Sequence, residues 1–281
     1  MGEMVPADER NGLPLITSEQ VRALAAQNHI NETVIFREYL QLAFLQKLYQ
    51  KKPSQQIYFK GGTAIHLIFG APRFSEDLDF TVGLSAREFE VFMEGIFRRM
   101  EAEESVTWKE KKSLAGKQYL LTAPPGILPY SATVALDFSF REKVLSPAHS
   151  IIQSAYPILF TSFVHHLSQE EILAEKIRAI MTRRKGRDLY DLWFLLSKGV
   201  SVQSDLIRKK LDYYKLTDVT DDDILKRIAS FPQKDFVLDL RPFVPQNERE
   251  RLSEFFGYLQ TQVKQAFVNN VEPFDFAQGG R

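Results

Sequence analysis

The sequence predicts an α+β fold, in which a mixed sheet with helices is followed by a part that is nearly all helical. Two observations support this prediction. Up to about residue 157, short apolar strands alternate with capped helices, and beyond it the periodic segments have the spacing of helices. We therefore expect two domains, an α/β core with N-terminal helices at 1–160 and a helical domain at 161–281.

The individual elements follow from capping residues, apolar periodicity and breakers. Helices are expected at 18–27, 31–49, 63–69, 85–101, 168–180, 187–197, 204–214, 221–230 and 247–268. Strands are expected at 57–60, 78–82, 106–111, 117–122 and 133–138. Ser85 with Glu88, and Ser168 with Glu171, have the spacing of a capping box.

Composition narrows the class of protein. The chain has 281 residues, 44% hydrophobic and 26% charged, which are ordinary values for a globular protein. It has no apolar run near the roughly 20 residues that span a bilayer, and its start, MGEMVPADERNG, has no secretory pattern. Cysteine is absent, which excludes disulfides, thiolate metal sites and a cysteine nucleophile. We expect a cytoplasmic protein that does not bind membranes.

The stretch KGGTAIHLIFGAPRFSEDLDF carries the first chemical signal. Asp77 and Asp79 are two residues apart in an expected strand, so both side chains project from the same face. Two neighbouring carboxylates repel each other unless a cation neutralises them. A hard divalent ion, Mg²⁺ or Mn²⁺, fits oxygen ligands and also binds substrate phosphates.

The same stretch contains a turn suited to phosphates. Gly61 and Gly62 permit close approach of the backbone, and the Thr63 hydroxyl with the following helix offers hydrogen-bond donors. Glycines beside paired aspartates indicate a phosphoryl or nucleotidyl transfer site. Asp-x-Asp alone also occurs in calcium loops and ordinary turns, so the ordered combination carries the prediction.

A third acid stands in the expected strand TVALDFSF. Asp137 shares one strand face with Ala135 and Ser139, while apolar residues occupy the other face. It is a candidate third metal ligand or general base. The alternative is an acid in solvent at the end of a strand.

Three blocks of the sequence together resemble the AbiEii/AbiGii-type nucleotidyltransferases of the polymerase-beta superfamily, many of which are toxins of toxin–antitoxin systems. The blocks are KGGTAIHL, RFSEDLDF and EEILAEKIRAIMTRRKGRDLYDLWFLL, and they cover most of residues 57–196. The resemblance implies a polymerase-beta-like sheet and an NTP-dependent nucleotidyltransferase. The residues that match the family's nucleotide-binding, metal-binding and catalytic positions are Gly61, Gly62, Thr63, Ser75, Asp77, Asp79, Asp137, Lys176 and Asp191.

The third block assigns further roles. The resemblance implies that Lys176 holds the NTP phosphates and that Asp191 is an essential acid; a solvated helix lysine is the alternative for Lys176. Arg187 and Asp191 have the spacing of a helix ion pair, and Asp188 can cap the helix or bind Arg184. We expect Arg187 and Asp188 to support the site from outside it.

A basic run lies within the same block. Its members are Arg178, Arg183, Arg184, Lys185 and Arg187. Arg183, Arg184 and Lys185 are candidates for binding a polyanionic acceptor. The alternative is that these cations oppose a helix dipole at the end of a helix.

The predicted reaction is attack by an acceptor hydroxyl on the α-phosphate of an NTP, with release of pyrophosphate. The resemblance implies RNA as the acceptor, in particular the 3′ end of tRNA, and an antitoxin partner with a DNA-binding domain. One alternative is transfer to a protein side chain or a small hydroxylated molecule. Another is a binding module without catalysis that pairs with an antitoxin. In the catalytic hypothesis, the helical part completes the active site.

Overall fold

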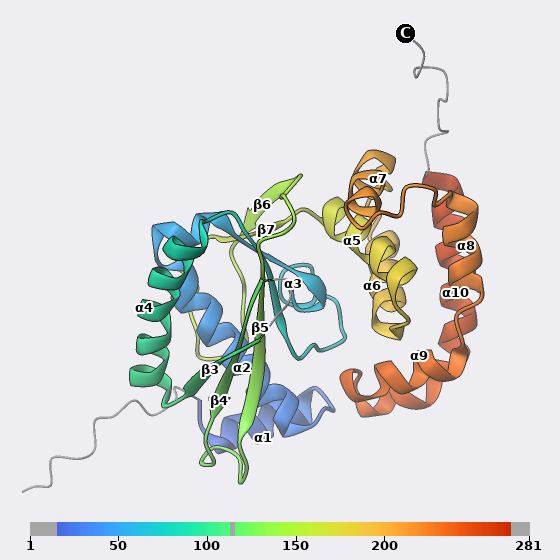
Figure 1. The fold of residues 1–281 in the computed structure, drawn as a ribbon. Coiled ribbons are helices and arrows are strands. Elements are labelled where there is room, and N and C mark those ends of the chain that lie inside the picture. Colours follow the sequence, from blue (N-terminus) through green and yellow to red (C-terminus); the bar gives the residue numbers. More distant parts are fainter. Residues whose placement is uncertain (1–15, 113–115, 271–281) are drawn as a thin grey trace, which may run out of the picture. The chain divides into compact units, whose positions relative to one another are not determined.

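The structure, a computed structural model, describes residues 16–112 and 116–270 (Figure 1). The chain divides into two compact units. The first unit runs to Gly70 and then covers Phe74–His166, whereas the second holds Ala71–Arg73 and the chain from Leu167 onward. The segment MGEMVPADERNG, in which no secretory signal is expected, lies outside the described residues.

The first unit is built around a seven-stranded sheet in the part of the chain that is described. Its strands are β1 (Ile57–Lys60), β2 (Leu78–Val82), β3 (Thr107–Lys111), β4 (Gly116–Ala123), β5 (Ala132–Ser139), β6 (Pro147–Ser150) and β7 (Val164–Leu167). They lie in the order β3-β4-β5-β2-β1-β7-β6. Strand β2 is parallel to β5 and antiparallel to β1, and β1 is parallel to β7. The predicted mixed sheet is confirmed.

The helical elements of the first unit are α1 (Ser18–Gln27), α2 (Glu32–Tyr49), the short η1 (Lys52–Gln56), α3 (Gly61–Leu67) and α4 (Ala86–Glu104). Helices α2 and α4 pack on the apolar face of this sheet. Phe44 of α2 contacts Phe80 of β2, with ring centroids 6.2 Å apart, and Phe89 of α4 contacts Phe138 of β5 at 4.8 Å. Burial alternates along β5, as a strand with one covered face requires. The acid Asp137 therefore lies on the face opposite Phe138.

The second unit is helical in its described residues. Its elements are α5 (Gln169–Thr182), α6 (Gly186–Ser197), α7 (Ser204–Tyr213), α8 (Asp221–Ala229), α9 (Gln233–Leu240), η2 (Arg241–Phe243), η3 (Gln246–Arg251) and α10 (Leu252–Asn270). Helix α6 lies very close to α9 because Gly186 has no side chain: a β-carbon there would lie 2.7 Å from the Cα of Phe236.

A buried ion cluster joins α5 to α7. Lys210 Nζ lies 2.8 Å from Glu171 Oε1 and 2.9 Å from Glu175 Oε1. The Ser168 hydroxyl accepts a hydrogen bond from the Glu171 backbone amide, as predicted for a cap. The carboxylate of Glu171, which was expected to complete a capping box, binds Lys210. At Ser85 and Glu88 the full capping box is present.

The expected helices and strands are present within a few residues of their predicted bounds. Strands β6 and β7 and helix α9 were not predicted. Among the described helices, none has the length and apolar character needed to cross a membrane.

Candidate active site

Two of the predicted acids meet at the centre of the sheet. Strands β2 and β5 are parallel neighbours, and their register pairs Asp79 directly with Asp137. Both side chains are half-buried, and they lie on the sheet face opposite the one that carries the phenylalanines. The Gln118 amide on β4 donates a hydrogen bond of 2.9 Å to Asp137 Oδ1, so one carboxylate oxygen is oriented by the neighbouring strand. Asp137 therefore lies beside Asp79 and is not an isolated acid, and its part in a metal site stays a prediction.

The glycine turn lies against the Asp79 carboxylate. Gly61 follows β1 directly and has a φ of 78°, a conformation that L side chains rarely adopt. A β-carbon on Gly61 would lie 2.3 Å from Asp79 Oδ2, inside van der Waals contact. Gly61 is therefore required both by its backbone conformation and by the space that the carboxylate needs. The structure brings the turn and the aspartate together, as the sequence predicted.

The Thr63 and Ser75 side chains flank the segment that leads into β2. The Thr63 hydroxyl donates to the backbone carbonyl of Asp77, and Thr63 is buried. This hydrogen bond ties the start of α3 to the residue before β2, whereas the sequence suggested a donor to phosphate. The backbone carbonyl of Ser75 accepts a hydrogen bond from the Gln41 side chain. Both contacts fix the backbone on which Asp77 stands.

Two charged residues that the sequence reasoning missed lie near the acids. Lys60 on β1 is the direct antiparallel partner of Asp79, so the neighbours of Asp79 across the sheet are Lys60 and Asp137. Lys60 Nζ lies 3.6 Å from Glu142 Oε2, and both residues are buried. The position of Lys60 directly before the glycine pair could have indicated its place in the site. Glu142 follows β5 in a loop, and no sequence pattern marks it.

The donor set can be compared with what a divalent cation requires. In the described part of the chain, no three carboxylate or histidine groups are gathered as a ready metal site. Mg²⁺ is usually bound by one or two carboxylates, and water and substrate phosphates complete its coordination. The adjacent oxygen donors of Asp79 and Asp137 fit an ion that arrives with a nucleotide.

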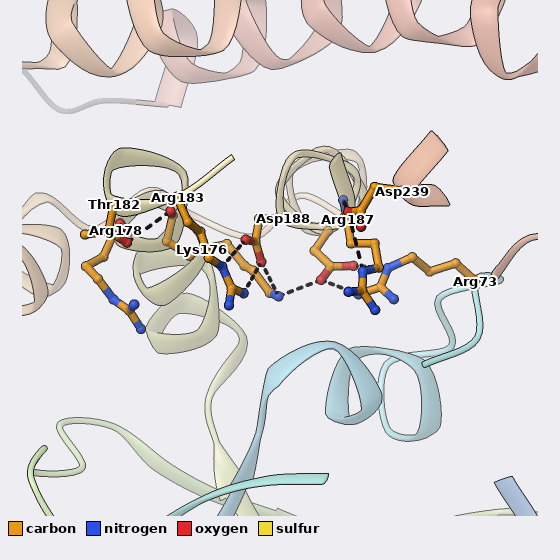
Figure 2. A network of polar contacts seen from close by, with 10 residues as sticks. Arg73, Lys176, Arg178, Thr182, Arg183, Arg187, Asp188 and Asp239 are labelled. Atoms are coloured by element: carbon orange, nitrogen blue, oxygen red, sulfur yellow. Dashed lines mark hydrogen bonds and ion pairs between the residues drawn. The ribbon is translucent and has the colours of Figure 1, made fainter. Parts of the chain in front are cut away.

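The second unit holds a chain of ion pairs that includes Lys176 and Asp188, both labelled in Figure 2, together with Asp191. Lys176 Nζ lies 3.0 Å from Asp188 Oδ1 and 2.7 Å from Asp191 Oδ2. Asp191 also accepts two hydrogen bonds from the Arg73 guanidinium, one from Nε at 2.6 Å. At the other end, Arg183 Nε and Nη2 donate to Asp188 at 2.7 and 3.0 Å. Lys176 is therefore fixed by two carboxylates and is not the solvated helix lysine of the alternative interpretation.

Electrostatics keeps this network charged. Burial alone would lower the pKa of Lys176, but Asp191 and Asp188 outweigh it and raise that pKa above its ordinary value. Burial would raise the pKa of Asp188, but Lys176 and Arg183 hold it below its ordinary value. Lys176 and Asp188 therefore stay ionised next to each other.

The structure corrects two expectations about this block. Asp191 pairs with Arg73 and Lys176, so its predicted pairing with Arg187 is wrong. Arg187 instead contacts Asp239, at 3.4 Å. Arg184 was considered as a partner of Asp188, but Asp188 pairs with Arg183 and Lys176 instead. Sequence reasoning missed Arg73 because its partner stands 118 residues away.

The basic run divides into paired and exposed members. Arg183 is committed to Asp188, although 57% of its side chain is exposed. The Arg178 guanidinium lies 4.3 Å from the centre of the Tyr214 ring, and its Nε is buried without a hydrogen-bond partner. Arg184 and Lys185 are exposed in the three-residue connection between α5 and α6. They are the members of the run that are most open to a polyanion.

The His66 side chain packs inside the first unit. His66 Nε2 lies 3.1 Å from Glu38 Oε2, and its ring contacts Phe74 with centroids 5.0 Å apart. Both contacts are structural and lie inside the first unit.

Comparison with known proteins gives a family and a fold. A family model described as "Nucleotidyl transferase AbiEii toxin, Type IV TA system" matches residues 43–273, which is most of the chain. No curated protein matches the chain.

Solved structures with low sequence identity share the fold. MenT4, a nucleotidyltransferase toxin from Mycobacterium tuberculosis, is 18% identical with a TM-score of 0.61, and the match covers 92% of this chain and 100% of that one. A putative nucleotidyltransferase from H. pylori is 21% identical with a TM-score of 0.57, covering 85% and 97%. JHP933 from Helicobacter pylori is 20% identical with a TM-score of 0.56, covering 85% and 94%. At these identities the likeness concerns the fold alone.

Proposed function

The chain belongs to the AbiEii family of nucleotidyltransferase toxins, and we propose that it transfers a nucleotide from an NTP to the 3′ end of an RNA, with tRNA as the acceptor class. In this reaction an acceptor hydroxyl oxygen forms a bond to the α-phosphorus, and the bond from that phosphorus to the bridging oxygen of pyrophosphate breaks. The hydroxyl proton passes to a carboxylate or to water.

The observation that carries the proposal is the pairing of Asp79 with Asp137 beside Gly61. Asp79 and Asp137 would hold Mg²⁺ or Mn²⁺, with Asp77, exposed just before β2, as a further candidate ligand. The ion would supply charge for the phosphates and lower the pKa of the acceptor hydroxyl. Asp137 is a further candidate for accepting the proton, because Gln118 already orients one of its oxygens. The turn at Gly61, Gly62 and Thr63 admits the triphosphate close to the backbone.

Lys176 is proposed to neutralise the phosphates of the NTP. Its ammonium is held by Asp188 and Asp191, which also bind Arg183 and Arg73, respectively. Fixed positive charge aimed at a leaving pyrophosphate is an efficient form of catalysis because it needs no reorganisation during the reaction. Asp191 acts in this proposal by positioning Lys176.

Two observations favour a polyanionic acceptor and a protein partner. Arg184 and Lys185 are exposed beside the network, which suits RNA phosphates better than a small neutral acceptor. The description of the matching family names a type IV toxin–antitoxin system, so we propose an antitoxin encoded with this chain.

The test is incubation of the full chain with each labelled NTP and total tRNA, with MgCl₂ or with EDTA. We expect label in the tRNA band with Mg²⁺ and none with EDTA. Asp79→Asn should abolish the label, whereas the matched control Asp205→Asn, an exposed acid on α7, should retain it. Label on protein or on a small molecule would reject the RNA acceptor, and the absence of NTP consumption would reject catalysis.

A further inference from the structure

An aromatic cavity in the helical unit has no role in the chemistry described above. It has a volume of about 890 Å³ and lies between α6, α10 and the η3 segment, with Pro72 also in its wall. Its aromatic wall consists of Tyr190, Trp193, Phe255 and Tyr258. This volume is in the range of about 300–1,000 Å³ that is usual for small-ligand sites.

The four rings meet one another at tilted or perpendicular angles. Trp193 and Phe255 meet at 86° with centroids 4.8 Å apart, and Tyr190 and Trp193 meet at 59° and 5.4 Å. Tyr258 is 55% exposed at the edge of the wall, 6.2 Å from Phe255. None of these pairs is stacked in parallel, and each ring has two faces, so the faces that no neighbouring edge occupies can stack on a planar guest.

Polar groups in the same wall favour a guest with hydrogen-bond donors. Glu248 and Glu254 line the cavity together with Arg251. Carboxylates accept hydrogen bonds from exocyclic amines, as they do in the recognition of cytosine. Burial raises the pKa of Tyr190 to about 12, so its hydroxyl stays protonated and uncharged at neutral pH.

The position of the cavity links it to the ion network. Tyr190 precedes Asp191, and Pro72 precedes Arg73, so the wall includes the sequence neighbours of both residues in the Arg73–Asp191 pair. Another cavity of the same unit, about 580 Å³ and lined by Met181, Lys215 and Arg227 among others, has no aromatic residue in its wall. The aromatic wall thus distinguishes the cavity beside the network from this second cavity.

We propose that this cavity binds a base of the acceptor RNA, with adenine or cytosine preferred over uracil. The inference rests on the proposed function, because it assigns the acceptor's base to a site next to the residues that hold Lys176. Stacking on aromatic side chains is the usual way in which proteins bind unpaired bases.

Trp193 provides a direct probe, because the chain has two tryptophans. The other, Trp108, stacks on Phe97 in the first unit and can be replaced by phenylalanine to keep the ring contact. In the Trp108→Phe chain, a short single-stranded RNA should quench the emission of Trp193. An abasic oligonucleotide of the same length and charge should bind at least about fivefold more weakly, the lower limit for loss of one base stack.

Tyr258→Ala in the same background should raise the Kd of the RNA at least about fivefold without changing the thermal unfolding temperature. Tyr130→Ala is the matched control, since Tyr130 is 47% exposed and lies in the first unit. Equal affinity for the abasic oligonucleotide, or an unchanged Kd in Tyr258→Ala, would overturn the inference. If a free NTP competes with RNA in quenching the emission of Trp193, the inference would also be overturned, because the cavity would then bind the base of the donor NTP.

The failure of this inference is distinguishable from failure of the proposed function. Quenching reports binding without any transfer, and transfer is measured separately with labelled NTP. If Tyr258→Ala labels RNA at the normal rate when RNA is subsaturating, the cavity has no part in the reaction. The proposed nucleotidyl transfer would then still stand.

Discussion

The carboxylates of the sheet and those of the helical unit are compensated in different ways. In the sheet, Asp79 lies directly beside Asp137, with Lys60 as its other neighbour across the strands. In the helical unit, Asp188 and Asp191 each contact two cations, and both are fully buried. The first arrangement leaves like charges adjacent and is suited to an added cation. The second is complete without any ligand, so its charges are already oriented when a substrate arrives.

This difference predicts opposite responses to the removal of one carboxylate. Taking charges out of water costs several kcal/mol for each ion, and a buried pair recovers this cost only while both partners are present. Removing an acid from the helical network should therefore affect folding. Removing one from the sheet should chiefly affect the reaction.

The largest expected effect on the fold is that of Asp191→Asn. It leaves the buried Arg73 and Lys176 without their shared counter-charge, so the free energy of unfolding should fall by about 3–5 kcal/mol. Urea unfolding followed by circular dichroism measures this change. The exposed control Asp205→Asn should stay within about 0.5 kcal/mol. A loss below about 1 kcal/mol for Asp191→Asn would show that the network does not hold the unit together.

Asp79→Asn should show the reverse pattern. We expect transfer to fall at least about a hundredfold, the scale on which loss of one charge-stabilising group lowers kcat. The free energy of unfolding should change by less than about 1 kcal/mol, because the substitution also relieves the adjacent charge of Asp137. Single-turnover transfer and urea unfolding on the same preparation give both numbers. Full transfer by a folded Asp79→Asn chain would contradict the metal assignment.

The pH dependence of stability sharpens the comparison further. The folded state holds the pKa of Asp188 below its ordinary value of about 3.9, so this group stabilises the fold above pH 4. That contribution is lost as the pH falls through the folded pKa. In Asp188→Asn, the acid limb of unfolding free energy against pH should be shallower by up to about 1.4 kcal/mol per pH unit, the slope for one proton. Identical acid limbs in both proteins would place the linked proton elsewhere.

Local patterns were enough to predict much of the sheet site. The alternation of strand side chains placed Asp137 and the apolar residues on opposite faces, and the structure agrees. The glycine turn was predicted to approach the acids, and Gly61 does lie against Asp79. These features depend on residues close in sequence or on strand periodicity, which a single chain reveals.

The helical network could not be predicted in the same way. Arg73 and Asp191 are 118 residues apart, and nothing in the local sequence indicates that they pair. The spacing of Arg187 and Asp191 suggested a helix ion pair, but tertiary packing offered each a different partner. Strands β6 and β7 were missed because PAHS and VHHL lack a run of alternating apolar and polar residues. Long-range packing decided these cases.

The smallest expected effect concerns the connection between α5 and α6, where a paired cation is followed by two exposed ones. Arg183 is bound to Asp188, whereas Arg184 and Lys185 are exposed, so neighbouring cations should respond differently. Arg183→Ala should lower stability because Asp188 loses a bidentate partner, with little change in the salt dependence of RNA use.

The double variant Arg184→Ala/Lys185→Ala should do the opposite. Its stability should be unchanged, but the slope of log KM for RNA against log salt should flatten by about 1.4, since each contact to a single-stranded phosphate contributes about 0.7. At moderate salt this amounts to a few-fold rise in the KM for RNA, and the KM for NTP should stay unchanged. The measurement compares wild type and both variants at two salt concentrations with tRNA as acceptor. Equal slopes in wild type and the double variant would mean that RNA does not contact this connection. The polyanion site would then have to be sought among other exposed cations.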